Sequence, residues 1–442
     1  MSTSNKSAKK KSLFGRYECW FILALVAFDY FVLYLHRAVL GFIQPPLKLE
    51  LGLSDEQIGW LQPAFIIPYA LSQLVVAYWS DRFQRRTILI SSLSASVVCL
   101  AAMGWANTFE QLVALRICLG FAQSASVPAI AGIMADCFTS KNRSTAVSVY
   151  LISYLSAVFV AGYSGGAIAE IPPWTLPWGA DSATLAGWRL ALIGFSLVGA
   201  FAVLLLMFLL REPERTDRDV SEDLGNEASS WLQTIGSVLA TPSFLVLAAI
   251  FVLFSIVTNT REYWLARYFY DSFDMSLKEA GTFSTIWIQP ATFIGMLVGG
   301  VWADRWARRW QGGRAAVSAL GMAAWVPALF VMGTAESLDI LRPAMIAFGW
   351  GLGMYCTNIW TTTFDVVHPA SRSTATGLLN VFAFAPGLAG PVVGYLKDQE
   401  IIDHFGTVFA WLSVPAALVV VLHAVYIWVT LPRDFRESKP NT

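Results

Sequence analysis

The chain contains the segment Trp79-Ser-Asp81-Arg82-Phe-Gln-Arg85-Arg86 and, farther along, the related segment Trp302-Ala-Asp304-Arg305-Trp-Ala-Arg308-Arg309. Two more motif pairs recur in the same order, at a similar spacing of roughly 220 to 230 residues. They are Leu53-Ser54-Asp-Glu-Gln-Ile-Gly59 with Met275-Ser276-Leu-Lys-Glu-Ala-Gly281, and the tetrapeptide Arg-Ser-Thr-Ala at Arg143 to Ala146 and again at Arg372 to Ala375. Three ordered pairs predict two homologous halves. In membrane carriers such halves usually enclose a site between them.

Apolar segments long enough to cross a bilayer recur along the whole chain. Of the 442 residues, 56% are hydrophobic and 14% are charged, a balance that excludes a single soluble core. Because the bilayer offers no water to backbone groups, each segment is expected to be a helix. We therefore predict an all-α membrane protein with twelve transmembrane helices. The twelve runs are 20–42, 56–78, 86–106, 109–134, 143–169, 188–210, 243–268, 279–303, 315–333, 340–364, 373–396 and 405–430.

Basic residues are distributed unevenly between the two sets of loops. The formal net charge is zero, yet most Lys and Arg residues lie in the loops on the side of the N-terminus. The positive-inside rule then predicts that both termini are cytoplasmic, which requires an even number of helices. The first run is too long for a removed signal peptide, so we retain it as a spanning helix. The opposite loops hold four basic residues, Lys48, Lys278, Arg342 and Lys397.

The polar stretches divide the chain into five parts. We expect a cytoplasmic tail over 1–19, a six-helix bundle over 20–210, a cytoplasmic linker over 211–242, a second six-helix bundle over 243–430 and a cytoplasmic tail over 431–442. On the other side of the membrane, the Pro- and Trp-rich segment 170–187 is expected to form an ordered interfacial loop. The five cysteines are scattered without disulfide or metal spacing.

The opening motif pair resembles the loop signature of the major facilitator superfamily, Gly-x-Leu-Ala-Asp-Arg-x-Gly-Arg-Lys. The signature glycines are replaced by Ala77 and Gln84 in the first copy, whereas the second keeps Gly300 and has Ala307 at the other position. The predicted fourth helix also resembles the superfamily's Arg-x-x-x-Gly element, with Arg116 and Gly120. The resemblance covers essentially the whole chain. It implies two pseudo-symmetric six-helix bundles, with both termini cytoplasmic.

Within that superfamily, the sequence is most similar to the anion:cation symporters and the spinster-like transporters. Both groups commonly carry Asp-Arg late in the first helix and Gly-Glu-Ala in the fourth. Here these elements read His36-Arg37 and Ala122-Gln123-Ser124, so two carboxylates of those groups are replaced. The Gly52-Leu53-Ser54 segment is retained, and Trp188-Arg189 with Arg211-Glu-Pro213 is more spinster-like.

Five ionisable residues lie inside the predicted spans, where a charge is costly unless it is paired or faces a water-filled cavity. They are Asp29, Arg37, Arg116, Arg261 and Glu262. Arg37 and Arg261 occupy nearly equivalent positions in the first helix of each half, and Arg116 lies at a similar depth. We expect all three to bind substrate, with Arg37 and Arg261 holding a carboxylate or phosphate between their guanidinium groups. The alternative is internal pairing, for example of Arg37 with Asp29.

Proton coupling requires a titrating group, and three residues are candidates: Asp29, Glu262 and His36. Asp29 and His36 are seven residues apart and so share a helix face. A structural, hydrogen-bonded His36 is the alternative. Other residues suited to contact a substrate are Gln123, Trp287, Gln289, Asn358 and Trp360, although membrane tryptophans more often serve packing.

Charged residues at the cytoplasmic helix ends are expected to act as a gate rather than in substrate binding. Carboxylates followed by guanidinium groups can join helices there by charge-assisted bonds and can also face lipid headgroups. The expected gate residues are Asp81, Arg82, Arg85, Arg86, Arg143, Asp304, Arg305, Arg308 and Arg372.

These patterns predict a secondary transporter that moves a small organic anion by alternating access, coupled to protons, in the inner membrane of a bacterium. The alternatives are a spinster-like transporter of an amphipathic lysolipid and a transporter-like membrane sensor. The sequence contains no nucleotide-binding loop and no nucleophile, base or metal constellation, so we expect neither an enzyme nor a cofactor. The expected partners are the substrate, a coupling ion and the lipid bilayer. Nucleic acid is not expected to bind, and the protein is expected to be a monomer.

Overall fold

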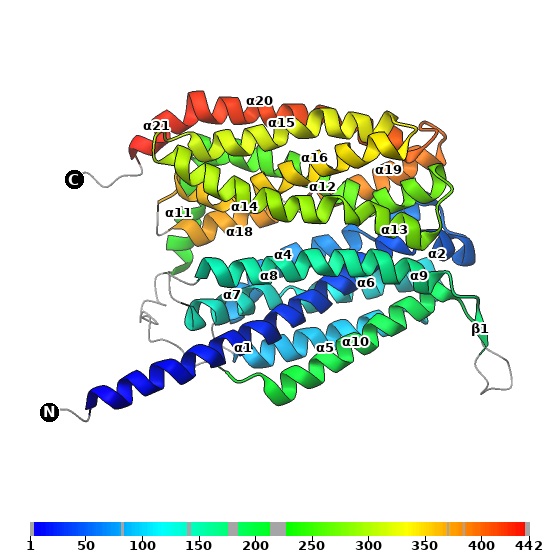
Figure 1. Cartoon of the computed structure of the whole chain (residues 1–442), viewed down its shortest axis with the longest axis horizontal. Helices are drawn as coiled ribbons and strands as arrows, with labels where there is room; N and C mark the ends of the chain where they lie inside the picture. The colour runs from blue at the N-terminus through cyan, green and yellow to red at the C-terminus, as the bar shows by residue number, and fades with distance from the viewer. Residues whose placement is uncertain are drawn as a thin grey trace.

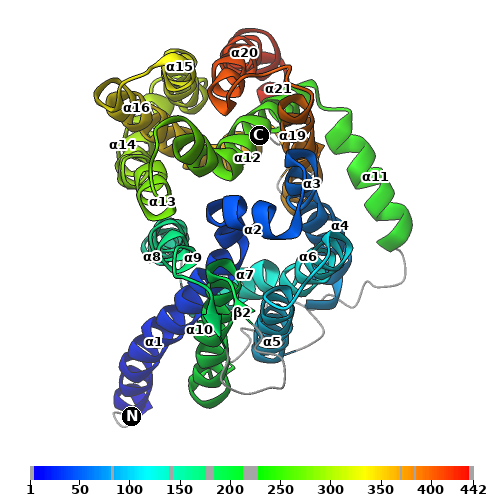
Figure 2. The same ribbon diagram turned by 90° about the vertical axis from the view of Figure 1, so that its right-hand side faces the viewer.

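Two helical bundles lie side by side in the computed structural model (Figures 1 and 2). The structure describes residues 4–80, 84–138, 143–175, 184–212, 227–368, 371–382 and 385–437. Both chain termini lie at one end of the molecule, as an even number of crossings requires (Figure 1). We call this end proximal and the opposite end distal.

The first bundle comes from the first half of the chain. Its elements are α1 (Ser4–Ala38), η1 (Val39–Phe42), α2 (Gln44–Leu51), α3 (Asp55–Trp60), α4 (Pro63–Ser80), α5 (Arg85–Met103), α6 (Phe109–Gln123), α7 (Ser126–Cys137), α8 (Arg143–Val160), η2 (Ala161–Gly165), α9 (Gly166–Ala169) and α10 (Gly187–Leu209). The segment before α10 forms a small antiparallel hairpin of β1 (Trp174–Thr175) and β2 (Thr184–Leu185) at the distal end (Figure 1).

The second bundle follows a linker that contains a helix of its own, α11 (Glu227–Leu239). Its elements are α12 (Pro242–Ser272), α13 (Leu277–Ile286), α14 (Ile288–Ala307), α15 (Gly313–Thr334), α16 (Leu338–Cys356), α17 (Ile359–Phe364), α18 (Arg372–Phe382), η4 (Ala385–Leu388), α19 (Ala389–Asp398), α20 (Phe405–Val425), η5 (Tyr426–Thr430) and α21 (Leu431–Glu437). Helix also extends into both predicted tails, because α1 begins at Ser4 and α21 ends at Glu437.

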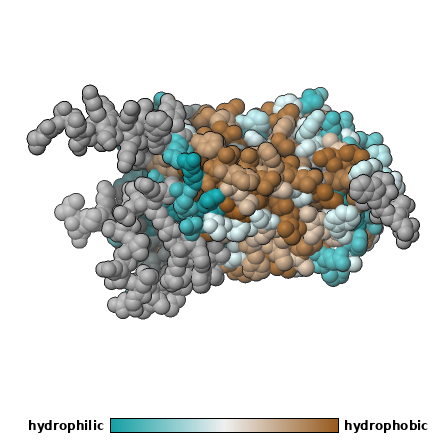
Figure 3. Space-filling model, turned by 90° about the horizontal axis from the view of Figure 1, so that it is seen from below, coloured by the Kyte–Doolittle hydropathy of each residue, from teal (hydrophilic) through white to brown (hydrophobic). Residues whose placement is uncertain are grey.

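An apolar belt separates polar ends on the face of the molecule drawn in Figure 3. Within the described residues, ten helical stretches are long and apolar enough to cross a membrane. The two other predicted runs, 56–78 and 340–364, are also helical, and a turn divides each into two helices, α3 with α4 and α16 with α17. The ten spans are consistent with twelve, but the full count stays a prediction.

The repeated Leu-Ser and Met-Ser motifs begin equivalent helices of the two halves. In the first, the Ser54 Oγ accepts a hydrogen bond from the Gln57 backbone N–H at 3.1 Å, and the Gln57 side chain accepts one from the Ser54 N–H at 3.0 Å. Ser276 and Glu279 repeat this capping box at α13. The motif pair found by sequence therefore has a local role, which is to start α3 and α13.

Candidate functional site

Arg37, near the end of α1, lies in a cage of aromatic rings. Its guanidinium carbon is 4.3 Å from the centroid of the Tyr69 ring, 4.8 Å from that of Tyr34 and 5.2 Å from that of Phe65. Its Nε donates a hydrogen bond to Gln123 Oε1 at 2.6 Å, whereas Nη2 is buried with no partner among the described residues. Because an amide is neutral, Gln123 orients this guanidinium group without cancelling its charge.

A chain of buried hydrogen bonds holds Gln123 in place. Its Nε2 donates to Ser96 Oγ at 2.8 Å, and Ser96 Oγ lies 2.9 Å from His36 Nδ1. His36 Nε2 is 3.1 Å from the Phe195 carbonyl, which can only accept, so the bond places a proton on Nε2. Ser96, which accepts from Gln123, can then donate to Nδ1. A neutral His36 satisfies every member of this chain, which favours its structural interpretation.

Tyrosines form a surface around Arg37 that sequence reasoning missed. The Tyr34 ring packs edge-on against Tyr154 at 4.3 Å between centroids, and the Tyr30 ring stacks on Tyr150 at 3.9 Å. The available signal was helical spacing, because Tyr30 and Tyr34 precede Arg37 by seven and three residues and share its helix face. The site therefore offers aromatic faces and phenol groups next to the arginine.

Arg261 and Glu262 place a second set of charges on α12, the first helix of the other half. Arg261 is only 3% exposed; its guanidinium carbon lies 5.3 Å from the centroid of the Phe348 ring, and its Nε lacks a partner among the described residues. Glu262 interacts electrostatically with both Arg261 and Arg37. The two halves are in close contact here, because a Cβ built on Gly41 of η1 would lie 3.6 Å from the Glu262 carbonyl oxygen. Residues from both halves thus form one charged cluster.

Arg116 on α6 has a different environment. Its Nε donates to the Leu61 carbonyl at 3.0 Å, at the turn that separates α3 from α4. The guanidinium carbon also lies 5.0 Å from the centroid of the Phe65 ring, and Nη1 is buried without a partner among the described residues. One role of Arg116 is therefore to satisfy a carbonyl that a helix break frees. The same phenylalanine ring also contacts Arg37.

Asp29 on α1 is fully buried, and neither carboxylate oxygen has a hydrogen-bond partner among the described residues. Leu25, Val26 and Leu33, about one helical turn away along α1, belong to a buried apolar cluster. The described structure has no Asp29–Arg37 ion pair, so it does not support that internal pairing. A bare carboxylate in such surroundings is strongly unfavourable, whereas a protonated carboxyl is far less so.

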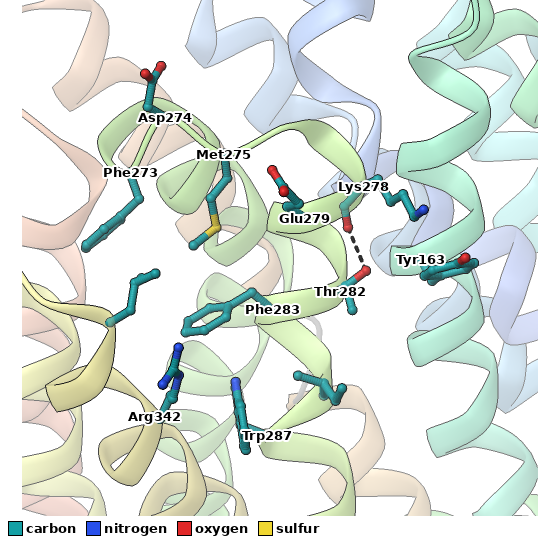
Figure 4. Close-up of a pocket in the computed structure, with 12 residues that line it drawn as sticks. Tyr163, Phe273, Asp274, Met275, Lys278, Glu279, Thr282, Phe283, Trp287 and Arg342 are labelled. Carbon is teal, nitrogen blue, oxygen red and sulfur yellow. Dashed lines mark hydrogen bonds between the residues drawn. The ribbon is translucent and has the colours of Figure 1, made fainter.

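The remaining predicted contact residues do not join the Arg37 cluster. Asn358 Nδ2 donates to the Met354 carbonyl of its own helix at 2.8 Å, and the Trp360 ring packs on Phe251 at 6.2 Å between centroids. Gln289 lines an apolar groove of 570 Å³ along α8 and α14. Trp287 lines a separate groove at the distal end (Figure 4).

The distal end is closed by two related seams between the halves. In one, Gly59 of α3 approaches Gly390 of α19 so closely that a Cβ on Gly59 would lie 2.4 Å from the Gly390 carbonyl oxygen. In the other, a Cβ on Gly281 of α13 would lie 2.2 Å from the carbonyl oxygen of Gly162 in η2. Gly59 and Gly281 occupy the same position of the repeated capping motif. Sequence duplication therefore appears in the structure as two equivalent contacts.

A carboxylate from the opposite half caps a helix at each seam. Asp398 at the end of α19 accepts hydrogen bonds from the backbone N–H groups of Asp55 and Glu56 at 2.9 and 2.7 Å. Glu170, after α9, accepts one from the Leu277 N–H at 2.6 Å. Carboxylates stabilise helix N-termini by satisfying free N–H groups and by opposing the helix dipole. Sequence reasoning did not find these caps.

A bulky residue at Gly281 should open the distal seam. A Cβ there overlaps the Gly162 backbone, and overpacking costs about 1–3 kcal/mol, enough to shift a conformational equilibrium roughly 5- to 150-fold. We expect Gly281→Val to lengthen the distance between spin labels at the exposed residues Ile171 and Lys278, which come from the two halves next to this seam, measured in a variant without the native cysteines. Gly194→Ala, where nothing lies within 4 Å of the added Cβ, is the matched control. Unchanged distances in Gly281→Val would contradict a closing role for this contact.

The predicted gate residues of the first half bond within that half. Arg85 forms an ion pair with Asp136, and the backbone N–H groups of Arg85 and Arg86 donate to Glu212 at 3.0 and 2.7 Å. Arg86 Nη2 also donates to the Met207 carbonyl at 2.5 Å. Asp81, Arg82 and the Arg143 side chain lie outside the described residues, so their predicted roles have no structural description.

The gate residues of the second half also bond within their own half. Arg314 lies 3.6 Å from Asp304 and 3.1 Å from Asp365, and Arg372 donates to the Phe364 carbonyl at 3.4 Å. Burial raises the pKa of the Asp365 carboxyl, and Arg314 opposes that shift. Each of these contacts joins residues of the second half. Two further predicted gate residues have exposed side chains, Arg305 and Arg308.

Known proteins resemble this chain in both sequence and fold. Residues 26–391 match the family model described as Major Facilitator Superfamily. The probable sulfoacetate transporter of Cupriavidus necator is 25% identical over 403 residues, covering 86% of this chain and 87% of that protein. Protein spinster homolog 1 of Xenopus laevis is 26% identical over 391 residues, covering 83% and 70%.

A solved structure shares the fold. A bacterial homolog of the human lysosomal transporter spinster, in an inward-facing and unoccupied conformation, matches with a TM-score of 0.77 at 20% identity. The match covers 96% of this chain and 99% of the other. The chain therefore belongs to the Major Facilitator Superfamily, as a multi-pass membrane transporter with that superfamily's fold.

Proposed function

We propose that this transporter moves a small organic anion, such as a carboxylate or a sugar acid, by alternating access and in symport with protons. The observation that carries the proposal is Arg37, which Gln123 orients at 2.6 Å without neutralising it. A fixed guanidinium group with a free Nη2 is suited to bind a carboxylate through charge-assisted hydrogen bonds. The sulfoacetate transporter among the relatives, whose named substrate is an organic anion, supports this class.

The charges of the central cluster also favour an anion. Arg37, Arg261 and Glu262 together carry one formal positive charge in excess, with the arginines supplied by different halves. An anionic substrate bound among them would balance that charge, and buried charges are best tolerated in balanced groups. Because the ligand would contact both halves, its binding could influence how they move relative to each other.

The asymmetry of the contacts between halves supports alternating access. Among the described residues, the seams and caps that join the halves lie at the distal end, where Asp398 and Glu170 act. We place the termini in the cytoplasm, and on that placement we propose that the described conformation is closed to the outside. We propose that the seams part in the opposite state, while the gate residues at the proximal end come together.

Asp29 is the residue we propose as the main proton carrier. It is buried and unpartnered, and it precedes Arg37 by eight residues on the same helix, so it is separate from the anion site. Protonation would remove a bare charge from an apolar layer. Glu262 is the second candidate, because its charge acts on both arginines. We further propose that the protein works as a monomer in the inner membrane of a bacterium.

Uptake by purified protein in proteoliposomes tests the proposal. Candidate carboxylates, sulfonates and sugar acids would be offered with an imposed pH gradient, acidic on the outside. We expect at least one organic acid to accumulate, and a protonophore to abolish its accumulation. Uptake of organic acids that ignored both the gradient and replacement of Arg37 would overturn both parts of the proposal.

A second candidate, transport of an amphipathic lysolipid, is favoured by one specific observation. The groove along α8 and α14 has a volume of 570 Å³ and is mainly apolar, with Ile152, Phe159 and Phe293 in its walls. Such a groove could accept an acyl chain from the membrane, and one relative is a spinster protein. Competition against uptake of a labelled lysolipid distinguishes the two functions. If a lysolipid is the substrate, unlabelled lysolipid should inhibit this uptake at low concentration, whereas short organic acids should not.

A further inference from the structure

The distal end carries a second groove, separate from the Arg37 cluster, with a volume of 550 Å³. It lies between the end of α12, α13 and the start of α16, and Figure 4 shows its lining. Phe273, Met275 and Phe283 form apolar walls, joined by Leu338. The cavity is large enough for part of a lipid or another small amphiphile.

Two donors face this groove without an acceptor between them. Trp287 Nε1 is buried and has no hydrogen-bond partner among the described residues. The Arg342 guanidinium carbon lies 5.9 Å from the centroid of the Trp287 ring, and Arg342 Nη1 also bonds Asp339 at 2.8 Å. Figure 4 shows the indole nitrogen and the guanidinium group on the same side of the cavity, next to Phe283. A buried indole N–H without a partner is unfavourable, and an oxyanion placed between these groups would satisfy it.

The charges around the groove select the kind of oxyanion. Its lining contains two cations, Lys278 and Arg342, and two carboxylates, Asp274 and Glu279. Lys278 Nζ is already placed 5.0 Å from the centroid of the Tyr163 ring. A balanced lining gives little long-range attraction for a free, highly charged anion. It is compatible with a zwitterionic headgroup, whose phosphate and ammonium groups carry opposite charges.

The position of the groove identifies the source of such a headgroup. Lys278 and Leu338 lie at the starts of α13 and α16, where polar ends meet the apolar belt. Phospholipid phosphates occupy this depth of a bilayer, and tryptophan side chains are enriched there. The acyl chains of a phospholipid extend from the phosphate toward the middle of the bilayer. Phe283 and Ile286 of α13 line the groove and can contact such a chain.

We propose that this groove binds one zwitterionic phospholipid of the leaflet at the distal end. Its phosphate accepts hydrogen bonds from Trp287 Nε1 and Arg342, and its acyl chain packs on Phe273, Met275 and Phe283. The lipid thereby joins α13 to α16 within the second half. This site is independent of the anion transport proposed above, and it gives Trp287 a role in lipid binding instead of substrate binding.

Native mass spectrometry of the purified full chain tests the site. The protein would be titrated with phosphatidylethanolamine, with diacylglycerol of the same chains, and with water-soluble glycerophosphoethanolamine. We expect a saturable adduct with phosphatidylethanolamine alone. Trp287→Phe keeps the ring but removes the donor, and Arg342→Gln removes the charge. Each should weaken that adduct about tenfold, since one charge-assisted hydrogen bond contributes at least this much.

The controls distinguish specific lipid binding from misfolding and from non-specific association with the apolar surface. Trp302→Phe replaces an exposed tryptophan on α14 that does not line the groove, and it should leave the adduct unchanged. The melting temperature of each variant checks that it is folded. Equal binding of diacylglycerol, or an unchanged adduct in both Trp287→Phe and Arg342→Gln, would overturn the proposal. Equal binding of glycerophosphoethanolamine would do so too, because it would show a headgroup site that does not need the membrane.

Discussion

Replacing Arg37 with glutamine should weaken binding of the transported anion by at least about 100-fold, because loss of one partner of a buried charge pair costs several kcal/mol. The substitution removes the free Nη2 and the positive charge, yet keeps a polar side chain beside Gln123. Isothermal calorimetry with the acid identified by uptake would measure the change. Arg433→Gln, at an exposed arginine near the C-terminus, is the matched control. An affinity within a few-fold of the unmodified protein would remove Arg37 from the site.

Gln123→Glu tests the acceptor of the hydrogen bond from Arg37. The glutamate would keep an acceptor near Arg37 Nε, now 2.6 Å from Gln123 Oε1, but would add the missing negative charge. An internal ion pair would then compete with the substrate, and we expect affinity to fall about tenfold or more. Retained affinity in this variant would show that the neutrality of Gln123 is irrelevant, even if Arg37 itself proved essential.

Replacing Asp29 with asparagine should uncouple transport from the proton gradient. Asparagine has nearly the same shape but cannot gain or lose a proton at this buried position. We expect accumulation driven by a pH gradient to fall to the equilibrium level, while exchange of labelled for unlabelled substrate across the membrane continues. The comparison of these two assays separates loss of coupling from loss of folding.

Glu336→Gln, at an exposed acid outside the proposed pathway, controls for the general effect of removing a carboxylate. Normal accumulation in Asp29→Asn would transfer the coupling role to Glu262 or to another group. Loss of exchange together with accumulation would indicate that Asp29 is needed for the conformational change itself, and would contradict its assignment as a proton carrier alone.

The fold was predictable because its signals repeat along the chain. Long apolar runs predicted the spanning helices, the uneven distribution of basic residues predicted their topology, and three duplicated motifs predicted two halves. The superfamily fold is confirmed. The helix breaks were less visible. A turn that interrupts a span, such as the one between α3 and α4, changes the local backbone without lowering hydrophobicity enough to divide the run.

The candidate site was predictable only in part, for a physical reason. Arg37 and Arg261 could be singled out from the sequence because ionisable residues are rare within long apolar runs. The bond from Arg37 to Gln123 spans 86 positions, and nothing local indicates it. Trp287 was expected at the substrate site, yet the structure places it in the distal groove with Arg342. Which side of a helix faces the other half depends on packing that hydrophobicity alone does not encode.

The paired distal seams have a consequence for leakage. Each seam has its own glycine contact and its own carboxylate cap, through Asp398 at one and Glu170 at the other. If one cap is lost in a thermal fluctuation, the second seam still holds the bundles together. Full separation of the two halves at the distal end needs both seams to part at the same moment, an event much rarer than the loss of either alone. Duplication of the ancestral half thus supplies the carrier with redundancy, which would protect the proton gradient under the coupling proposed above.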